Sequence, residues 1–159
     1  MALVRIIAVG KLKENYLKQA EAEYLKRLAS YLKLEIKEIP DLPVPENASP
    51  AQEEQVKNGE GALIDNLILP KSYLVVLDIE GKQLTSMELA RFLHERQVTA
   101  QDLTLVIGGS LGLVESIKAK ANLRLSFSKL TFPHQLFRIM LLEQLYRACK
   151  INRGEKYHK

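Results

Sequence analysis

Cysteine and long apolar runs are scarce in this sequence, and each shortage excludes a class of protein. Cys149 is the only cysteine among 159 residues, so no disulfide forms within the chain and a reducing compartment is expected. Without a CxxC pair or a Cys/His cluster there are no zinc ligands, so we expect no metal. No stretch approaches the roughly 18 apolar residues of a membrane helix, and no basic leader precedes the first apolar run. We therefore expect a cytoplasmic protein.

Charge is balanced over most of the chain and unbalanced only toward its end. Residues 1–134 carry 17 basic and 17 acidic side chains, whereas residues 135–159 carry six basic and two acidic ones. The whole net charge of +4 therefore lies in this last segment. A basic segment either binds a polyanion such as nucleic acid or keeps a chain end soluble, and charge alone favours the second explanation.

Apolar periodicity predicts alternating strands and helices. The expected strands are residues 3–9, 34–39, 73–78, 103–107 and 123–132, and the expected helices are 14–32, 50–68, 85–97 and 135–150. Capping-box patterns at Ser49 and Thr85 mark two of the helix starts. This alternation predicts an α/β fold with a mostly parallel sheet flanked by helices. Residues 1–159 are expected to form a single domain, with the proline-rich segment 40–50 as a surface loop.

Three segments follow predicted strands, where parallel sheets bind their ligands. Residues 76–81 form an acidic, glycine-terminated turn, and residues 107–112 form a glycine-rich turn that a ligand can approach closely. Residues 127–132 precede a proline and the last helix. Each segment is also explained as an ordinary turn or strand. The glycine turn matches neither GxGxxG nor GxxxxGK[ST], so it gives a phosphate-binding loop little support.

The helix expected over residues 135–150 is apolar around most of its circumference. Such a helix is buried on more than one side, either in the core or against a second subunit, and we favour a homodimer. Arg138 projects into the middle of the apolar arc. A buried arginine needs an acceptor, which is either a structural carboxylate or a group of the substrate.

Four motifs in order give the sequence a specific resemblance. They are VLDIEGK at 76–82, IGGSLGL at 107–113, LSFSKLTFPHQLFRIMLLEQLYRA at 125–148, and the terminal Tyr157-His158. Together they resemble the bacterial large-subunit ribosomal RNA methyltransferase H family, within the knotted SPOUT class, over nearly the whole chain. Glu80 and the pair Ser110-Leu111 depart from the turns of some relatives, which weakens any role for those side chains.

The resemblance implies an S-adenosylmethionine-dependent enzyme that methylates N3 of a pseudouridine in helix 69 of the large-subunit (23S) ribosomal RNA. It also implies a C-terminal trefoil knot, a homodimer, and action on the assembled ribosome. No metal or second cofactor is implied. By motif position the cofactor contacts the three strand-end segments, largely through backbone groups, at Leu77, Gly108, Phe127, Ser128, Lys129, Leu130, Thr131 and Phe132.

The basic end of the chain supplies the candidate catalytic and RNA-binding residues. N3 of a uracil-type base is protonated near neutral pH, so we expect His158 to act as its base and Arg147 and Arg153 to hold phosphate or stabilise the base anion. The expected RNA contacts are Arg138, Lys150, Lys156, Tyr157 and Lys159. A frayed terminus is the alternative for His158. A nucleotide-binding oxidoreductase and a noncatalytic ribosome-binding factor are the alternative functions.

Overall fold

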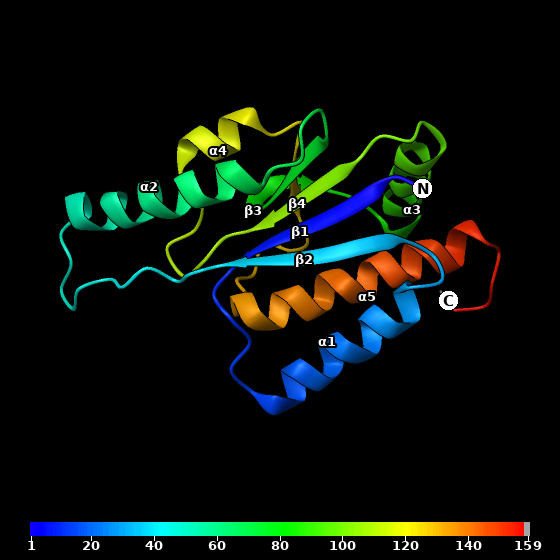
Figure 1. Cartoon of the computed structure of the whole chain (residues 1–159), viewed down its shortest axis with the longest axis horizontal. Coiled ribbons are helices and arrows are strands. Elements are labelled where there is room, and N and C mark those ends of the chain that lie inside the picture. The colour runs from blue at the N-terminus through cyan, green and yellow to red at the C-terminus, as the bar shows by residue number, and fades with distance from the viewer. Residues whose placement is uncertain (158–159) are drawn as a thin grey trace.

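Five parallel strands form one sheet in the order β2-β1-β4-β3-β5 in the computed structural model, which describes residues 1–157 (Figure 1). The strands are β1 (Leu3–Val9), β2 (Lys33–Ile39), β3 (Tyr73–Gln83), β4 (Leu103–Ile107) and β5 (Leu123–Ser126). The helices are α1 (Asn15–Leu28), α2 (Pro50–Leu67), α3 (Ser86–Val98), α4 (Glu115–Lys120) and α5 (His134–Asn152). The predicted α/β class, with a parallel sheet flanked by helices, is confirmed.

Helices cover both faces of the sheet because each strand alternates its side chains between them. In β1, Val4 and Ile6 pack into a core with α1, α3 and α5, whereas Ile7 and Val9 pack into a second core with α2 and α4. Figure 1 shows the same division, with α1 and α5 below the sheet and α2 and α4 above it. A strand covered on both faces has a nearly continuous apolar sequence, which is the pattern that predicted it.

The two predicted capping boxes are present. The Ser49 hydroxyl accepts a hydrogen bond from the Gln52 N–H at 3.1 Å, and the Gln52 side chain accepts one from the Ser49 N–H at 2.8 Å. Thr85 and Glu88 make the same pair of bonds at 3.1 and 2.9 Å. These bonds satisfy backbone donors that have no partner inside the helix, so they fix the starts of α2 and α3.

Three predicted boundaries are wrong for local reasons. The first helix ends at Leu28 instead of residue 32. Leu32 lies after the helix but is buried in the same core, so its apolar side chain extended the helical pattern in the sequence. The last strand ends at Ser126 instead of residue 132, because hydrogen bonds within the following loop replace the ladder. The third strand extends beyond residue 78 to Gln83, because it resumes pairing with β5 after an interruption.

Helix α5 is buried on several sides by its own chain. Leu141, Leu142 and Leu145 are at most 1% exposed, and the helix packs against the sheet, α1 and α3. Packing within one chain therefore explains the broad apolar arc, and the arc no longer supports a second subunit. The homodimer remains a prediction from the family resemblance. Neither α5 nor any other helix in the described chain is long and apolar enough to span a bilayer.

Arg138 was expected to contact RNA, and its position in the structure corrects that prediction. The residue is 1% exposed, and its guanidinium donates to Glu38 at 2.6 Å, to Glu21 at 3.2 Å and to the Gly10 carbonyl at 3.0 Å. A buried cation must be paired, and these three acceptors come from β2, α1 and the end of β1. Arg138 is therefore a structural ion pair that joins α5 to three other parts of the fold.

Replacing Arg138 with alanine leaves two carboxylates beside a buried cavity without their cation. We predict that Arg138→Ala lowers the free energy of unfolding by about 3 to 5 kcal/mol, measured by urea denaturation. Arg27→Ala is the matched control, because Arg27 pairs with Glu23 on the exposed face of α1 and its loss should cost much less. Equal losses for the two variants would contradict the structural role of Arg138.

Candidate functional site

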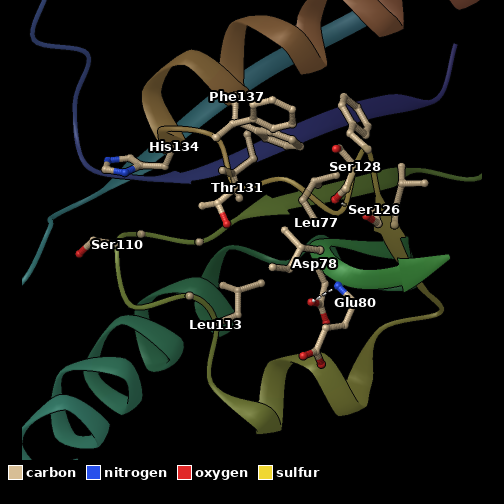
Figure 2. Close-up of a pocket in the computed structure, with 18 of the residues that line it drawn as sticks. Leu77, Asp78, Glu80, Ser110, Leu113, Ser126, Ser128, Thr131, His134 and Phe137 are labelled. Carbon is tan, nitrogen blue, oxygen red and sulfur yellow. Dashed lines mark hydrogen bonds between the residues drawn. The ribbon is translucent and has the colours of Figure 1, made fainter. Parts of the chain in front are cut away.

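A cavity of about 420 Å³ opens at the carboxyl edge of the sheet (Figure 2). Its walls come from β3, the turn after β4, the loop after β5 and the start of α5. The three strands β4, β3 and β5 are neighbours in the sheet, so the segments that follow them meet at one place. This edge is where an open parallel sheet binds its ligands.

A bulge in β3 forms the first wall. Leu125 of β5 lies opposite both Leu77 and Lys82, so the intervening residues 78–81 leave the ladder. A Cβ on Gly81 would lie 2.5 Å from the Arg124 carbonyl oxygen, so only glycine permits this close approach of the two backbones. The bulge places the acidic residues at 78 and 80 against the cavity, as bulges beside functional sites often do.

The glycine-rich turn after β4 forms the second wall. The Gly112 N–H donates to the Gly109 carbonyl at 3.0 Å, and Gly112 has a φ of +80°, which favours glycine. A Cβ on Gly108 would lie 3.0 Å from the Leu113 side chain and 3.1 Å from the Gly112 carbonyl carbon. The turn is therefore packed tightly behind the cavity and presents backbone toward it.

The loop after β5 and the start of α5 form the third wall. The Ser126 hydroxyl donates to the Ser128 carbonyl at 2.9 Å, and the Ser128 hydroxyl accepts from the Leu130 N–H at 3.0 Å. Phe137 packs against Phe127 with ring centroids 4.8 Å apart. It also stacks on Phe132 at 6.2 Å, so this end of the cavity is aromatic.

The opposite end of the cavity is charged. Asp78 and Lys118 both line it, with the Lys118 ammonium 3.8 Å from Oδ2 of Asp78. Lys118 also lies 3.7 Å from Glu115. Oδ1 of Asp78 accepts the Glu80 N–H at 3.0 Å, as Figure 2 shows, whereas Oδ2 is buried and has no hydrogen-bond partner in the described chain.

The structure brings seven of the eight predicted cofactor residues to this cavity. The exception is Lys129, whose side chain is exposed and does not line it. The sequence reasoning missed Lys118 because it gave no bounds for the short helix α4. It also missed Phe137 and His134, because the apolar and helical patterns gave both residues a sufficient structural explanation.

The basic tail, by which we mean the last turns of α5 from Arg147 together with the residues that follow the helix, is docked on the protein as far as residue 157. Glu143 binds Arg147 at 2.7 and 2.9 Å and accepts the Tyr157 hydroxyl at 2.5 Å. The Tyr157 ring packs edge-on against Tyr146, and the Arg147 guanidinium lies 4.9 Å from its centroid. The hydrogen bond to Glu143 raises the pKa of Tyr157 to about 12. In this state Tyr157 is engaged with its own chain and is not presented for base stacking.

Two other basic residues of the tail also have partners within the chain. Lys150 binds Glu155 at 2.7 Å, and this contact raises the pKa of the lysine. Arg153 donates to the Ser30 carbonyl at 3.0 Å, and its guanidinium lies 4.2 Å from the Tyr31 ring centroid. Lys156 is exposed. His158 and Lys159, predicted as a base and an RNA contact, lie outside the described residues.

The predicted cofactor residues and the predicted catalytic arginines lie at different ends of α5. His134 and Phe137 line the cavity from the first turn, whereas Arg147 is ten residues further along, about 15 Å along the helix axis. Arg153 follows the last residue of the helix. Within the described chain, the two predicted groups are therefore not brought together.

Glu60 of α2 is buried behind the glycine turn. It is 4% exposed and accepts the Leu42 N–H at 3.2 Å. A Cβ on Gly109 would lie 3.6 Å from its other carboxyl oxygen, so the carboxyl packs directly against the turn. Burial raises the pKa of Glu60, the Leu42 N–H partly opposes this, and the charge of Asp41 adds to it.

Comparisons with known proteins give one consistent result. Residues 2–158 match the family described as "Predicted SPOUT methyltransferase". The protein "Ribosomal RNA large subunit methyltransferase H" of Carboxydothermus hydrogenoformans is 51% identical over 157 residues, covering 98% of this chain and 99% of that protein. A solved structure of a probable methylase family protein from Haemophilus influenzae has a TM-score of 0.52 at 15% identity, covering 98% of this chain and 70% of that one. The last likeness bears on the fold alone.

The shifted pKa of Glu60 predicts a pH-dependent stability. Because the folded state holds the proton more tightly than the unfolded chain, the stability contribution of Glu60 falls as pH rises from about 4.3 through the raised pKa. Glu60→Gln should therefore gain stability relative to the wild type as pH rises through this window in urea denaturation.

Glu88→Gln provides a contrast of opposite sign to Glu60→Gln. Its capping-box bond from the Thr85 N–H lowers the pKa of Glu88, so the wild type should lose stability relative to this variant as pH falls through that pKa. Parallel pH profiles for the wild type and Glu60→Gln would contradict the burial of a carboxyl behind the turn.

Proposed function

This chain belongs to the SPOUT methyltransferase family, and from that premise we propose that it methylates large-subunit ribosomal RNA. The proposed reaction transfers a methyl group from S-adenosylmethionine to N3 of a pseudouridine in helix 69 of the 23S RNA, on the assembled ribosome. The name of the relative that is 51% identical supports the RNA substrate. We also propose that the protein is cytoplasmic and that its C-terminal part forms a trefoil knot.

The carboxyl-edge cavity is the observation that carries the proposed function. Its volume of about 420 Å³ lies within the range of small-molecule sites, and its walls combine apolar surface with a few polar groups. The aromatic end suits a flat base, the glycine turn lets a ligand approach the backbone, and the buried Oδ2 of Asp78 offers an acceptor without a partner. These features fit an adenosylmethionine molecule held mainly by Leu77, Gly108 and residues 127–132.

The protein contributes position more than acid or metal chemistry in this proposal. Adenosylmethionine supplies a methyl group that is already activated by its sulfonium leaving group. The three irregular wall segments are held by their own hydrogen bonds, so they present a fixed surface to a ligand. Correct alignment of two reactants is worth a large part of a displacement barrier, which such a surface supplies.

The basic tail provides the proposed contacts to RNA and the proposed proton acceptor. His158 would accept the N3 proton, and Arg147 and Arg153 would hold phosphates or the base anion. Lys150, Lys156, Tyr157 and Lys159 complete the proposed RNA surface. Since Glu143 and Glu155 bind several of these groups in the free protein, RNA phosphates would replace the carboxylates as their partners.

Exposed apolar side chains near the cavity support the proposed homodimer. Ile79 is 51% exposed and Leu130 is 71% exposed, and both line the cavity. Leu136 on the first turn of α5 is 41% exposed. A cluster of exposed apolar groups around a site is typical of an interaction surface, and a second copy of the chain is the partner we propose.

The tail and the cavity are separable in this proposal, which predicts the outcome of a truncation. Removing residues 153–159 should leave S-adenosylmethionine affinity within about twofold of the wild type, because none of the described residues of this segment, 153–157, lines the cavity. Methyl transfer to ribosomes should fall below detection, because the proposed base and phosphate contacts are lost. The measurements are calorimetric titration with the cofactor and incorporation of a labelled methyl group.

A variant with one positive charge removed elsewhere is the control for the truncation. Lys33→Gln removes an exposed positive charge at the amino end of β2, far from the carboxyl edge, and should leave both measurements unchanged. Methylation that survives the truncation would reject the tail as part of the site. Loss of cofactor binding together with methylation would show that the tail also closes the cavity.

A further inference from the structure

One buried carboxylate oxygen in the cavity wall lacks the hydrogen bond that such an atom requires. The Asp78 side chain is 7% exposed, and its Oδ2 has no hydrogen-bond partner in the described chain. Its other oxygen is occupied by the Glu80 N–H. Buried polar atoms are nearly always paired, so an unpaired one in a native fold calls for a reason.

Two other buried side-chain atoms share this condition among the described residues, Arg96 Nε and Gln97 Nε2. Neither residue lines the large cavity, whereas Asp78 does. The Arg96 guanidinium also lies 4.5 Å from the Tyr73 ring centroid, so its charge is partly satisfied by an aromatic face. Gln97 lines a smaller cavity of about 110 Å³, together with Cys149 and Arg153. Asp78 is therefore the one of the three residues that lines the cavity proposed for the cofactor.

The bulge explains why this carboxylate sits where it does. If β3 continued in register past Leu77, the side chain at 78 would take its place in a regular ladder with β5. The four-residue excursion removes Asp78 from the ladder, and the Glu80 N–H fixes the carboxyl group through Oδ1. Oδ2 is consequently held in one position, buried beside the Lys118 ammonium and without a hydrogen-bond donor.

The surrounding charge selects the kind of donor. Lys118 is already 3.8 Å from Oδ2, a distance too long for a hydrogen bond but close enough to balance the charge of the carboxylate. A ligand ammonium at Oδ2 would meet Lys118 as a neighbouring like charge, which is unfavourable. A neutral hydroxyl avoids that repulsion and still forms a strong hydrogen bond to a charged acceptor.

The two ends of the cavity favour a sugar hydroxyl over a base amino group. The rings of Phe127, Phe132 and Phe137 gather at the end formed by α5, where a flat aromatic base finds apolar contact. Asp78 lies at the other end with Lys118. A nucleoside placed with its base against the rings carries its ribose toward the charged end.

We propose that Oδ2 of Asp78 accepts a hydrogen bond from a ribose hydroxyl of the bound cofactor. The inference rests on the proposed function, because it takes an adenosyl nucleoside as the ligand. Asp78 is then a binding residue for the sugar, and Lys118 is a positioning residue that balances the carboxylate charge. The bulge at residues 78–81, which Gly81 permits, holds this acceptor in the cavity wall.

The test combines changes in the protein with changes in the ligand. Asp78→Asn keeps an acceptor for the Glu80 N–H and replaces Oδ2 with an NH₂ group, which cannot accept from a hydroxyl. The ligand is S-adenosylhomocysteine, compared with its 2′-deoxy and 3′-deoxy analogues by calorimetric titration. Lys118→Gln is a second test variant, which removes the ion pair and keeps the carboxylate acceptor.

We expect the wild type to bind one of the two deoxy analogues about 10- to 100-fold more weakly than S-adenosylhomocysteine. Asp78→Asn should bind S-adenosylhomocysteine more weakly by a similar factor and should no longer distinguish it from that analogue. Lys118→Gln should still distinguish the two. The wild-type titrations alone measure the hydroxyl contribution, so the finding that no hydroxyl is bound would not depend on the folding of any variant.

Several outcomes would overturn the inference. Wild-type affinity for both deoxy analogues equal to that for S-adenosylhomocysteine would show that no hydroxyl is bound. Equal losses on hydroxyl removal in the wild type and in Asp78→Asn would place the contact elsewhere. Either result leaves the proposed function intact. Failure of the wild type to bind S-adenosylhomocysteine at all would reject both, so the two failures are distinguishable.

Discussion

The buried guanidinium of Arg138 is the interaction on which the arrangement of the carboxyl edge depends. It connects α5 to Glu38 on β2, to Glu21 on α1 and to the backbone at Gly10, immediately after β1. Because α5 begins at the cavity and leads into the basic tail, this anchor sets the position of both. Moving α5 away from these acceptors would leave a buried cation unpaired, which is energetically costly. The position of α5 relative to β1, β2 and α1 is therefore narrowly defined.

The cavity owes its shape to departures from regular structure at three adjacent strand ends. A bulge follows the paired part of β3, a glycine turn follows β4, and a serine-stabilised loop follows β5. Each departure is specified by a local hydrogen bond or by a glycine that admits close contact, such as Gly81 against β5. Regular secondary structure supplies the platform, and the irregular segments supply a surface that a cofactor can occupy.

The layout of the fold was predictable from the sequence, because strands buried on both faces and capped helices leave strong local signals. The runs 3–9 and 103–107 matched their strands, and Ser49 and Thr85 marked their helices. The bulge at 78–81 was not predictable, because a break in register depends on pairing with β5. The same reason applies to Arg138: the sequence showed a charge in an apolar arc, but its partners are 100 or more residues away.

The candidate site was predictable in part. The rule that ligands bind at strand ends located all three wall segments, but the charged pair of Asp78 and Lys118 comes from two elements that only the fold brings together. For the basic tail, composition predicted the position of the positive charge but not its partners. The excess of basic residues marked the segment in the sequence. Its contacts with Glu143 and Glu155 depend on the folded structure, and the net charge of the segment does not reveal them. A basic segment with such internal partners is held in place until a stronger polyanion competes for it.

We propose that this carboxyl edge delivers a methyl group to one base of ribosomal RNA. The most direct measurement incubates unmodified ribosomes with the protein and S-adenosylmethionine bearing a deuterated methyl group. Mass spectrometry of nuclease fragments of the RNA then locates the label. We expect a single labelled methyl group on a pseudouridine base in helix 69 of the 23S RNA. A label in another fragment, or no label although the protein binds the cofactor, would contradict it.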